Sequence, residues 1–414
     1  MDRPLDLIVF GATGFTGRLV AEYLQSRHGT DPGLRWALAG RDAAKLAAVR
    51  EAIGADLALP LPLPLPLPLL TADAADASAL AALVAHTHAV ITSVGPYQRH
   101  GEALVRACAA AGTDYFDLCG EPAWMAAMIP QLQPAAAASG ARIVFSCGFD
   151  SIPFDLGVLF LQDEAVRRFG APLSQVRGRV RVIKGGPSGG TIASALATVA
   201  QMQRDPAVAR AMADPFALTP GFRGPAQPDS ADAEYDELAR AWTAPFVMAP
   251  INTKNVHRSN ALRGHPWGRD FVYSERLMAG DGPRGAARAR RMARVNWLQN
   301  LALGFAPARA LLQRFVLPKP GTGPNAQQRL EGRYEIVFTG QAADGSVLRA
   351  VVTGDRDPGY GSTSKMISES ALCLLRDVPR SETPGGVWTP GAAMGLALVR
   401  RLQAHAGLSF KIES

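Results

Sequence analysis

A glycine-rich turn near the start of the chain constrains the fold more than any other feature. The sequence Gly-Ala-Thr-Gly-Phe-Thr-Gly occupies residues 11–17, directly after the apolar run 5–10 and before the amphipathic segment 18–27. Glycines here allow a tight turn and let the backbone approach a pyrophosphate, whose charge then lies at the positive end of the following helix. The turn therefore predicts a dinucleotide site, and the alternative is a purely structural turn. The predicted site residues are Gly11, Thr13, Gly14, Phe15, Thr16 and Gly17.

Strand-like and helix-like segments alternate after this turn. Strands are predicted at residues 35–39, 89–94, 115–118 and 142–146, and helices at 43–53 and 101–111. Strands that are separated by helices form a parallel sheet covered on both faces. Residues 1–150 are therefore predicted to form an α/β domain of the Rossmann type that binds the cofactor.

A run in which proline occupies every second position from Pro60 to Pro68 interrupts this alternation. Proline lacks the backbone donor that a central strand needs, so the run is predicted to form an edge or an extended loop. A proline-rich ligand motif is the alternative.

The pattern changes after residue 150. Alternating segments at 177–184, 334–339 and 347–353 predict strands of an antiparallel sheet. Residues 205–233 are rich in proline, alanine, aspartate and glycine and are predicted to be irregular. Residues 151–380 are therefore predicted to form a second α/β domain with a mainly antiparallel sheet, for substrate binding or dimerisation.

The tip of the second predicted strand indicates which dinucleotide binds. Arg41 stands where NAD-selective sites place a carboxylate, and Lys45 follows one helical turn later. A guanidinium can pair with the 2′-phosphate of NADP and stack on the adenine, so NADPH is the predicted cofactor. Asp42 leaves NAD open, because a shift of one residue would place its carboxylate at the strand tip.

Residues after the next predicted strands should lie near the nicotinamide, because the carboxyl ends of parallel strands face the ligand. Gly95 and Pro96 are predicted to approach the cofactor, and Tyr97 either donates a proton or packs beside the ring. The candidate substrate contacts are Cys119, Asp150 and Ser151. A packed thiol is favoured for the cysteine, and the start of a helix explains the other two equally well.

Positive charge is concentrated in one part of the chain. The net charge of the whole chain is +7, whereas residues 258–333 alone contain 14 basic and 4 acidic residues. Within this part, residues 284–317 combine closely spaced arginines with apolar residues. Such a basic amphipathic stretch predicts contact with a membrane surface or an acidic partner, and a solvated arginine face is the alternative. Nucleic-acid binding is not predicted, because neither interleaved aromatic residues nor a known module accompanies the arginines.

The four cysteines, Cys108, Cys119, Cys147 and Cys373, form no Cys-x-x-Cys pair and have few histidines near them. Reduced thiols in a cytoplasmic protein are therefore predicted, and neither a disulfide framework nor a metal site is expected. No stretch reaches the ~20 uninterrupted apolar residues that a transmembrane helix needs, so any membrane contact is expected to be peripheral.

Motifs spread over nearly the whole chain resemble those of one known family. They are GATGFTG at 11–17, AGR at 39–41, SVGPY at 93–97, YFDLCGE at 115–121, CGFDSIPFDLG at 147–157, GDRDPGYGSTSKM at 354–366 and GGVWTPGAAMG at 385–395. On these motifs the chain resembles the saccharopine dehydrogenase-like oxidoreductases, and among them the branch of the trans-acting enoyl reductases. The proline-leucine expansion at 60–68 departs from the family pattern without touching the glycine turn.

The resemblance implies that NADPH delivers a hydride to the β-carbon of an α,β-unsaturated acyl or polyketide thioester. The resulting enolate needs an oxyanion donor and a proton source, and Tyr97 is the nominated donor. Two alternatives stay open, namely a non-catalytic NADP-binding protein on lipid surfaces and a saccharopine dehydrogenase-type amino-acid oxidoreductase. The resemblance also implies that residues 381–414, with a helix at 391–404, return to the first domain. A homodimer is a further expectation.

Overall fold

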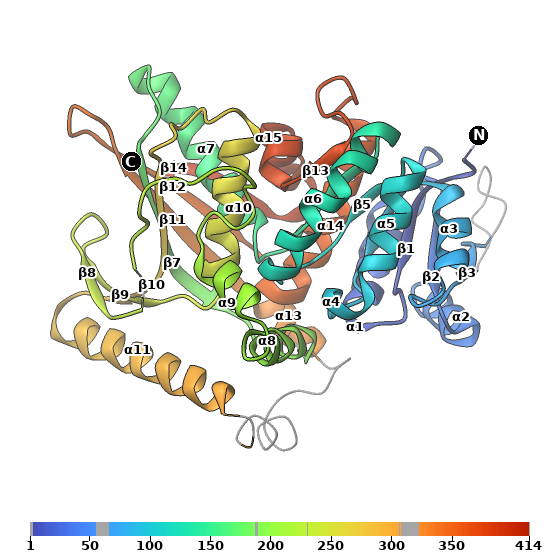
Figure 1. Ribbon diagram of the computed structural model, residues 1–414, viewed down its shortest axis with the longest axis horizontal. Coiled ribbons are helices and arrows are strands. Elements are labelled where there is room, and N and C mark those ends of the chain that lie inside the picture. The colour runs from blue at the N-terminus through green and yellow to red at the C-terminus, as the bar shows by residue number, and fades with distance from the viewer. Residues whose placement is uncertain are drawn as a thin grey trace.

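The computed structural model describes residues 3–54, 66–186, 189–229, 231–305, 307 and 323–413. Two seven-stranded sheets form its centre, and helices lie between them and along their outer faces (Figure 1). The prediction of a parallel Rossmann-type sheet joined to a second, mainly antiparallel α/β part is confirmed.

The first sheet, sheet A, has the strand order β13-β6-β5-β4-β1-β2-β3, and every neighbouring pair is parallel. Its strands are β1 (Leu5–Phe10), β2 (Trp36–Gly40), β3 (Leu69–Thr71), β4 (Thr87–Thr92), β5 (Asp114–Phe116), β6 (Arg142–Val144) and β13 (Gly386–Trp388). The strands after residue 110 are shorter than the sequence predicts. Strands β1 and β2 are rich in apolar residues because helices cover both faces of the sheet.

The side chains of β1 point alternately toward the two layers of helices that cover sheet A. Leu7 and Val9 belong to one hydrophobic cluster, whereas Ile8 and Phe10 belong to another. The first cluster includes residues of α1 (Phe15–His28), α2 (Ala43–Ala52) and α14 (Thr363–Arg376). The second includes residues of α3 (Ala77–Ala85), α5 (Glu102–Ala111) and α6 (Pro122–Ser139). The carboxyl ends of the strands, where the predicted site lies, thus emerge between two layers of helices.

Strand β3 forms the edge of sheet A directly after the end of the proline run. The carbonyl of Pro68 accepts a hydrogen bond of 3.0 Å from the amide of Leu38 on β2. Most of the proline run falls within 55–65, which lies outside the described residues.

The second sheet, sheet B, has the order β14-β12-β11-β7-β10-β9-β8. Its strands are β7 (Gln175–Lys184), β8 (Glu234–Asp236), β9 (Ala241–Pro245), β10 (Val272–Gly280), β11 (Arg333–Gln341), β12 (Val347–Gly354) and β14 (Leu408–Glu413). Only β7 and β10 pair in parallel, and the other neighbours are antiparallel. The predicted strands at 177–184, 334–339 and 347–353 are therefore present.

The prediction that 205–233 is irregular is wrong at its start. Helix α9 (Pro206–Ala213) begins there, and the carboxylate of Asp205 caps it by accepting a 2.8 Å hydrogen bond from the amide of Ala207.

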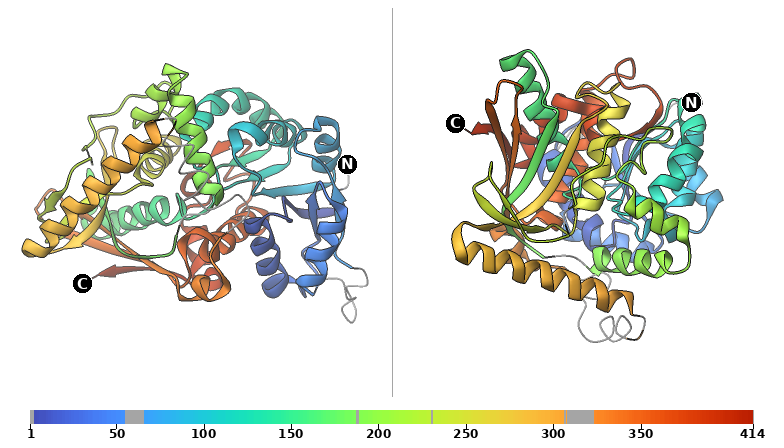
Figure 2. Two further views of the ribbon diagram at one scale, coloured as in Figure 1. Left: turned by 90° about the horizontal axis from the view of Figure 1, so that it is seen from below. Right: turned by 60° about the vertical axis from the view of Figure 1, so that its left-hand side comes forward.

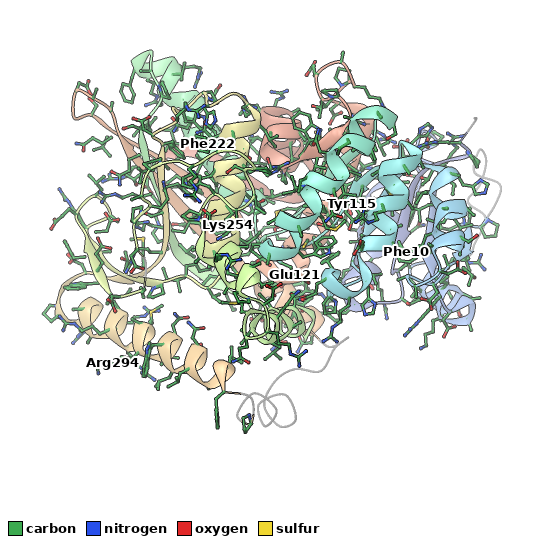
Figure 3. The ribbon with its side chains drawn as sticks, viewed as in Figure 1. Phe10, Tyr115, Glu121, Phe222, Lys254 and Arg294 are labelled. Carbon is green, nitrogen blue, oxygen red and sulfur yellow. The ribbon has the colours of Figure 1, made fainter. Side chains whose placement is uncertain are left out.

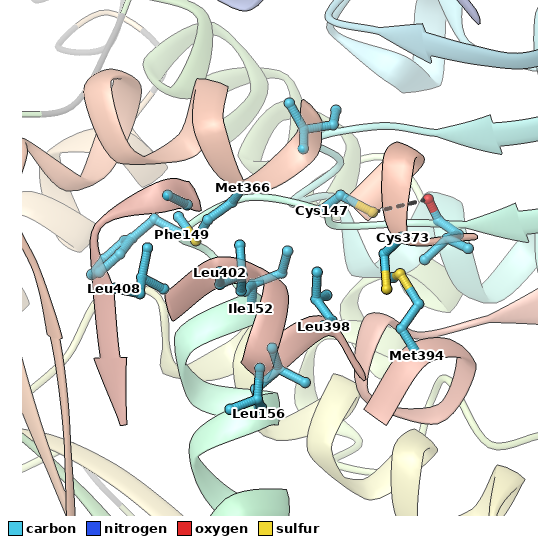
Figure 4. Packing of buried hydrophobic residues seen from close by; sticks show 14 of the residues in the cluster. Cys147, Phe149, Ile152, Leu156, Met366, Cys373, Met394, Leu398, Leu402 and Leu408 are labelled. Atoms are coloured by element: carbon cyan, nitrogen blue, oxygen red, sulfur yellow. Dashed lines mark hydrogen bonds between the residues drawn. The ribbon is translucent and has the colours of Figure 1, made fainter. Parts of the chain in front are cut away.

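Helices α7 (Ile152–Phe169) and α15 (Pro390–Arg401) lead along the chain from sheet A to sheet B. Helix α10 (Ala249–Leu262) packs against both of them. Figure 4 shows part of the core that they form with α14, in which Cys147, Ile152, Met366 and Leu398 lie in one cluster. The last residues of the chain join both sheets, since β13 pairs with β6 and β14 pairs with β12. The domain limits at 150 and 380 stay predictions.

Helix α11 (Gly282–Gly304) lies along the outside of the molecule (Figure 2). It packs against β9 and β10, and its end lies near α8 (Gly189–Met202). No helix in the described ranges is long and apolar enough to cross a membrane. All four cysteines are free and buried.

Candidate functional site at the carboxyl edge of sheet A

The turn after β1 has no space for side chains at two of its glycines. Gly11 has a φ of +85°, and a Cβ atom there would lie 2.5 Å from Cγ2 of Val94. A Cβ atom on Gly17 would lie 2.2 Å from the carbonyl oxygen of Gly11. Both positions require glycine, because these distances are far below van der Waals contact. The turn is therefore pressed against both the loop after β4 and the start of α1.

The start of α1 is open to a ligand. Gly14 precedes the helix, and no side chain caps its first amides. Uncapped amides and the positive end of the helix dipole form an anion site, so the turn fits a pyrophosphate. The contribution of Gly14, Phe15, Thr16 and Gly17 to phosphate binding stays a prediction.

The tip of β2 distinguishes the roles of its two charged residues. Asp42 caps α2, since its Oδ1 accepts a 3.0 Å hydrogen bond from the amide of Lys45. That bond lowers the pKa of Asp42 and ties the carboxylate to the helix. Arg41 is exposed and makes no hydrogen bond or ion pair with any described residue. Thr13 lies beside this tip, because a Cβ atom on Gly40 would be 3.8 Å from its Oγ1. The guanidinium therefore stays available for a phosphate.

A buried carboxylate joins the loops after β4 and β5. Glu121 is 2% exposed, and its two oxygens accept hydrogen bonds of 2.9 Å from the amides of Tyr97 and Gln98. These amides begin α4 (Tyr97–His100), and the hydroxyl of Ser194 on α8 donates a further bond of 2.8 Å. Glu121 directly precedes α6 and lies next to α8 (Figure 3). Sequence reasoning missed this contact, because Ser194 is distant along the chain.

Tyr97 uses its hydroxyl group within the fold. The hydroxyl donates to the carbonyl of Thr92 at 3.2 Å and accepts from the amide of Leu118 at 3.0 Å. Burial, followed by the nearby charge of Asp117, raises the pKa of Tyr97 well above its usual range. These contacts favour the packing role that the sequence also allowed. Gly95 and Pro96, which precede Tyr97, lie between β4 and α4 and are joined by a cis peptide bond.

The three candidate substrate contacts have different surroundings. Cys119 is fully buried, and burial raises the pKa of its thiol well above the usual range. Ser151 is also fully buried, and its hydroxyl accepts a 2.6 Å bond from the Asn255 amide group. Asp150 alone is half-buried, and desolvation raises its pKa to about 6. The loops after β5 and β6 meet here, since a Cβ atom on Gly120 would be 3.9 Å from Oδ2 of Asp150.

Asp117 is a further buried carboxyl group, to which the sequence assigned no role. Its Oδ1 accepts from the amides of Cys119 and Ser146 at 3.0 and 2.9 Å, and its Oδ2 accepts from the hydroxyl of Tyr115 at 3.0 Å. Burial raises the pKa of Asp117 to about 7 despite these bonds. The group fixes the relative position of the loops after β5 and β6.

Two residues from the far end of the chain pack against the ring of Phe15, the first residue of α1. The rings of Phe15 and Tyr360 meet edge to face with their centroids 4.8 Å apart. The guanidinium of Arg329 lies 5.7 Å from the centroid of the Phe15 ring. Phe15 and Tyr360 belong to two of the motifs, but the sequence gives no sign that they lie together.

Comparison with known proteins shows the family. Residues 7–144 match the family model of the saccharopine dehydrogenase NADP binding domain. A trans-acting enoyl reductase of Mycobacterium tuberculosis (strain ATCC 25618 / H37Rv) is 43% identical and covers 99% of this chain and 97% of its own. The chain belongs to the trans-acting enoyl reductase family. A second member, from Mycobacterium bovis (strain BCG / Pasteur 1173P2), is 38% identical over 97% of this chain and 96% of its own.

The fold of this enoyl reductase family member also occurs in a solved structure. The apo saccharopine dehydrogenase (L-Glu forming) of Saccharomyces cerevisiae has a TM-score of 0.53, with 13% identity, over 99% of this chain and 100% of that one. The matched NADP binding domain includes the glycine turn, Arg41 and the loops after β4 and β5. No group of three or more His, Cys, Asp or Glu side chains in the described parts of the chain could hold a metal ion.

Proposed function

We propose that the protein is an NADPH-dependent reductase of α,β-unsaturated acyl thioesters. The observation that supports this most strongly is the uncapped start of α1, directly after a glycine turn in which Gly11 and Gly17 have no space for a side chain. The NADP binding domain match and the family relatives named trans-acting enoyl reductase agree with it. Arg41 is proposed to select the 2′-phosphate, with Lys45 adding positive charge nearby.

NADPH would supply a hydride to the β-carbon of the unsaturated thioester. The residues of this chain then have three tasks. The glycine turn and the first amides of α1 hold the phosphates, and the loops after β4, β5 and β6 place the substrate. A neutral hydrogen-bond donor is needed at the thioester oxygen, where negative charge develops after hydride addition.

The direct test is NADPH oxidation by the purified full chain with enoyl thioesters, ketones and imines offered in parallel. Reduction of the enoyl thioester alone, with one deuterium from labelled NADPH found at the β-carbon, is the expected result. Reduction of imines instead would support amino-acid oxidoreductase chemistry. Tight NADPH binding without turnover of any acceptor would support the non-catalytic alternative.

We also propose that the protein contacts anionic lipid surfaces through α11. Its last turns leave Val295, Trp297, Leu298, Leu301 and Phe305 between 44% and 63% exposed. Its first turns carry exposed arginines at 284, 288, 290, 291 and 294 and contain no acidic residue. Arg294 points away from the body of the molecule (Figure 3). An arginine-rich stretch beside exposed tryptophan, leucine and phenylalanine side chains suits the interface of an anionic bilayer.

Vesicle sedimentation tests this contact. Phosphatidylglycerol vesicles should bind the protein, neutral phosphatidylcholine vesicles should not, and salt should weaken binding. Leu298→Ser with Leu301→Ser should abolish binding, whereas the control Leu330→Ser, an equally exposed leucine on α13 (Ala326–Glu331), should not. Equal binding by all variants would contradict the proposal. A change of molecular mass in light scattering for the α11 variant alone would show that a second copy covers this face.

A further inference from the structure

Tyr360 has a buried hydroxyl group that makes no hydrogen bond within the described part of the chain. Its side chain is 2% exposed, and its oxygen makes no hydrogen bond with any described residue. A buried polar group without a partner destabilises a fold, so such groups in a native structure call for an explanation. Binding of a ligand is one of the accepted explanations.

The position of Tyr360 indicates which ligand this is. Its ring packs edge to face on Phe15, at the point where the glycine turn enters α1. Asp150, at the end of the loop after β6, is near enough for its charge to raise the pKa of Tyr360, after the larger effects of burial and of Asp357. The ring therefore lies beside the start of α1, at the carboxyl edge of sheet A, where both reactants must meet.

The backbone around Tyr360 is held firmly in place. It forms the short π-helix η1 (Pro358–Ser362), a structure that occurs often at functional sites. The carboxylate of Asp357 accepts hydrogen bonds from the amides of Tyr360 and Gly361 at 3.0 and 2.8 Å. The hydroxyl of Thr363 donates to the carbonyl of Pro358 at 2.8 Å and accepts from the amide of Phe149 at 3.0 Å. Thr363 thus ties η1 to the loop that carries Asp150.

Other buried tyrosines near this edge have partners inside the protein. Tyr97 donates to Thr92, Tyr115 donates to Asp117, and the hydroxyl of Tyr334 pairs with that of Ser362 at 2.9 Å. Tyr273 also lacks a hydrogen bond in the described structure, but its hydroxyl faces β7, 2.7 Å from where a Cβ atom on Gly178 would lie. Among these residues, Tyr360 alone combines an unpartnered hydroxyl with a place beside the glycine turn.

We propose that the Tyr360 hydroxyl donates the hydrogen bond to the carbonyl oxygen of the substrate thioester. This assignment rests on the proposed function. In the reaction, the hydride forms a new C–H bond at the β-carbon, the π pair of the C=C bond forms a double bond between the α-carbon and the carbonyl carbon, and the π pair of the C=O bond moves onto the oxygen. The Tyr360 O–H group stabilises that oxygen, and water supplies the proton that completes the α-carbon. NADPH leaves as NADP⁺, so electrons and protons balance.

The test compares Tyr360→Phe with the matched control Tyr334→Phe, which removes a partnered hydroxyl next to the same segment. We expect Tyr360→Phe to lower kcat about 100-fold, because removal of one preorganised oxyanion donor has effects of this size. Its NADPH Kd should stay within about twofold of the parent value, and its urea midpoint should be unchanged or higher. For Tyr334→Phe the urea midpoint should fall, with kcat close to that of the parent.

Two results would overturn the assignment. One is a parent-like kcat in Tyr360→Phe, and the other is a fall in its urea midpoint equal to that of Tyr334→Phe. The unfolding comparison needs no substrate, so it tests whether the Tyr360 hydroxyl has a partner inside the protein even if the parent reduces no enoyl thioester. In that case calorimetry with a saturated acyl thioester and NADP⁺ gives a second measurement. Equal affinity for the parent and Tyr360→Phe would then also contradict the assignment.

Discussion

Gly17→Ala should damage the cofactor site more than a change of one methyl group suggests. The new Cβ atom would lie 2.2 Å from the carbonyl oxygen of Gly11, 2.8 Å from its carbonyl carbon and 2.9 Å from Oγ of Ser93. Relief of the first contact needs a shift of about 1 Å, because carbon and oxygen atoms prefer to stay well above 3 Å apart. Gly11 cannot easily move away, because the side chain of Val94 packs directly against it.

The size of the effect follows from these contacts. Overpacking of a rigid site costs about 1–3 kcal/mol of folding free energy. A shift of about 1 Å also breaks the alignment of at least one amide with a phosphate oxygen. A charge-assisted hydrogen bond contributes about 1.5–3 kcal/mol, so the Kd for NADPH should rise about 10- to 100-fold.

Titration of NADPH against the tryptophan fluorescence, together with urea unfolding, measures both effects. Gly304→Ala is the matched control, because a Cβ atom there would meet none of the described residues within 4 Å and the residue ends helix α11. The control should bind NADPH normally and gain up to about 1 kcal/mol in stability. Parent-like NADPH affinity in Gly17→Ala would refute the inference that this turn holds the phosphates.

Three further predictions concern single residues. Arg41→Ala should weaken NADPH binding about 10-fold or more while leaving NADH binding unchanged. Parallel titrations of both nucleotides check this, and the control is Arg27→Ala, which changes an exposed arginine in the last turn of α1. Asp117→Asn should flatten the pH dependence of the free energy of unfolding. The pKa of Asp117 is about 7 in the folded protein and near 3.9 in the unfolded chain, so the parent loses about 1.4 kcal/mol of stability for each unit by which the pH rises between these values. Urea unfolding at about pH 5 and pH 7 measures this, and an unchanged slope would show that Asp117 is ionised in the fold. Tyr97→Phe should lower the free energy of unfolding by about 1 kcal/mol and reduce kcat far less than Tyr360→Phe; a larger loss of kcat would restore Tyr97 as the donor.

The sequence was sufficient to predict the first strands and the cofactor turn, because these depend on local patterns. An apolar strand, glycines that no side chain can replace and an amphipathic helix follow one another within 30 residues. The prediction that Arg41 binds the 2′-phosphate rests on a local pattern too, namely its place at the tip of the second strand. Helix α9 was missed although Asp205 and Pro206 form a standard start signal, because the surrounding proline and glycine residues dominated the pattern.

The rest of the site depends on contacts between distant parts of the chain. The Glu121 carboxylate binds two amides 23 and 24 positions away and a serine 73 positions away. Phe15 and Tyr360 are separated by most of the chain, and no hydrophobic pattern in the sequence indicates that their rings are in contact. The hydroxyl of Tyr97 could not be assigned from its place after a strand, because its partners at Thr92 and Leu118 depend on how the loops fold back.

The pairing of β13 with β6 and of β14 with β12 has a consequence for the synthesis of the protein. Sheet A receives β13 and sheet B receives β14, so neither sheet is complete until these late segments have emerged from the ribosome. Until then β6 and β12 expose unpaired backbone groups, the kind of edge that recruits strands from other molecules. The nascent chain therefore passes through a stage in which β6 and β12 are open edges, before β13 and β14 cover them and become the edges of the finished sheets.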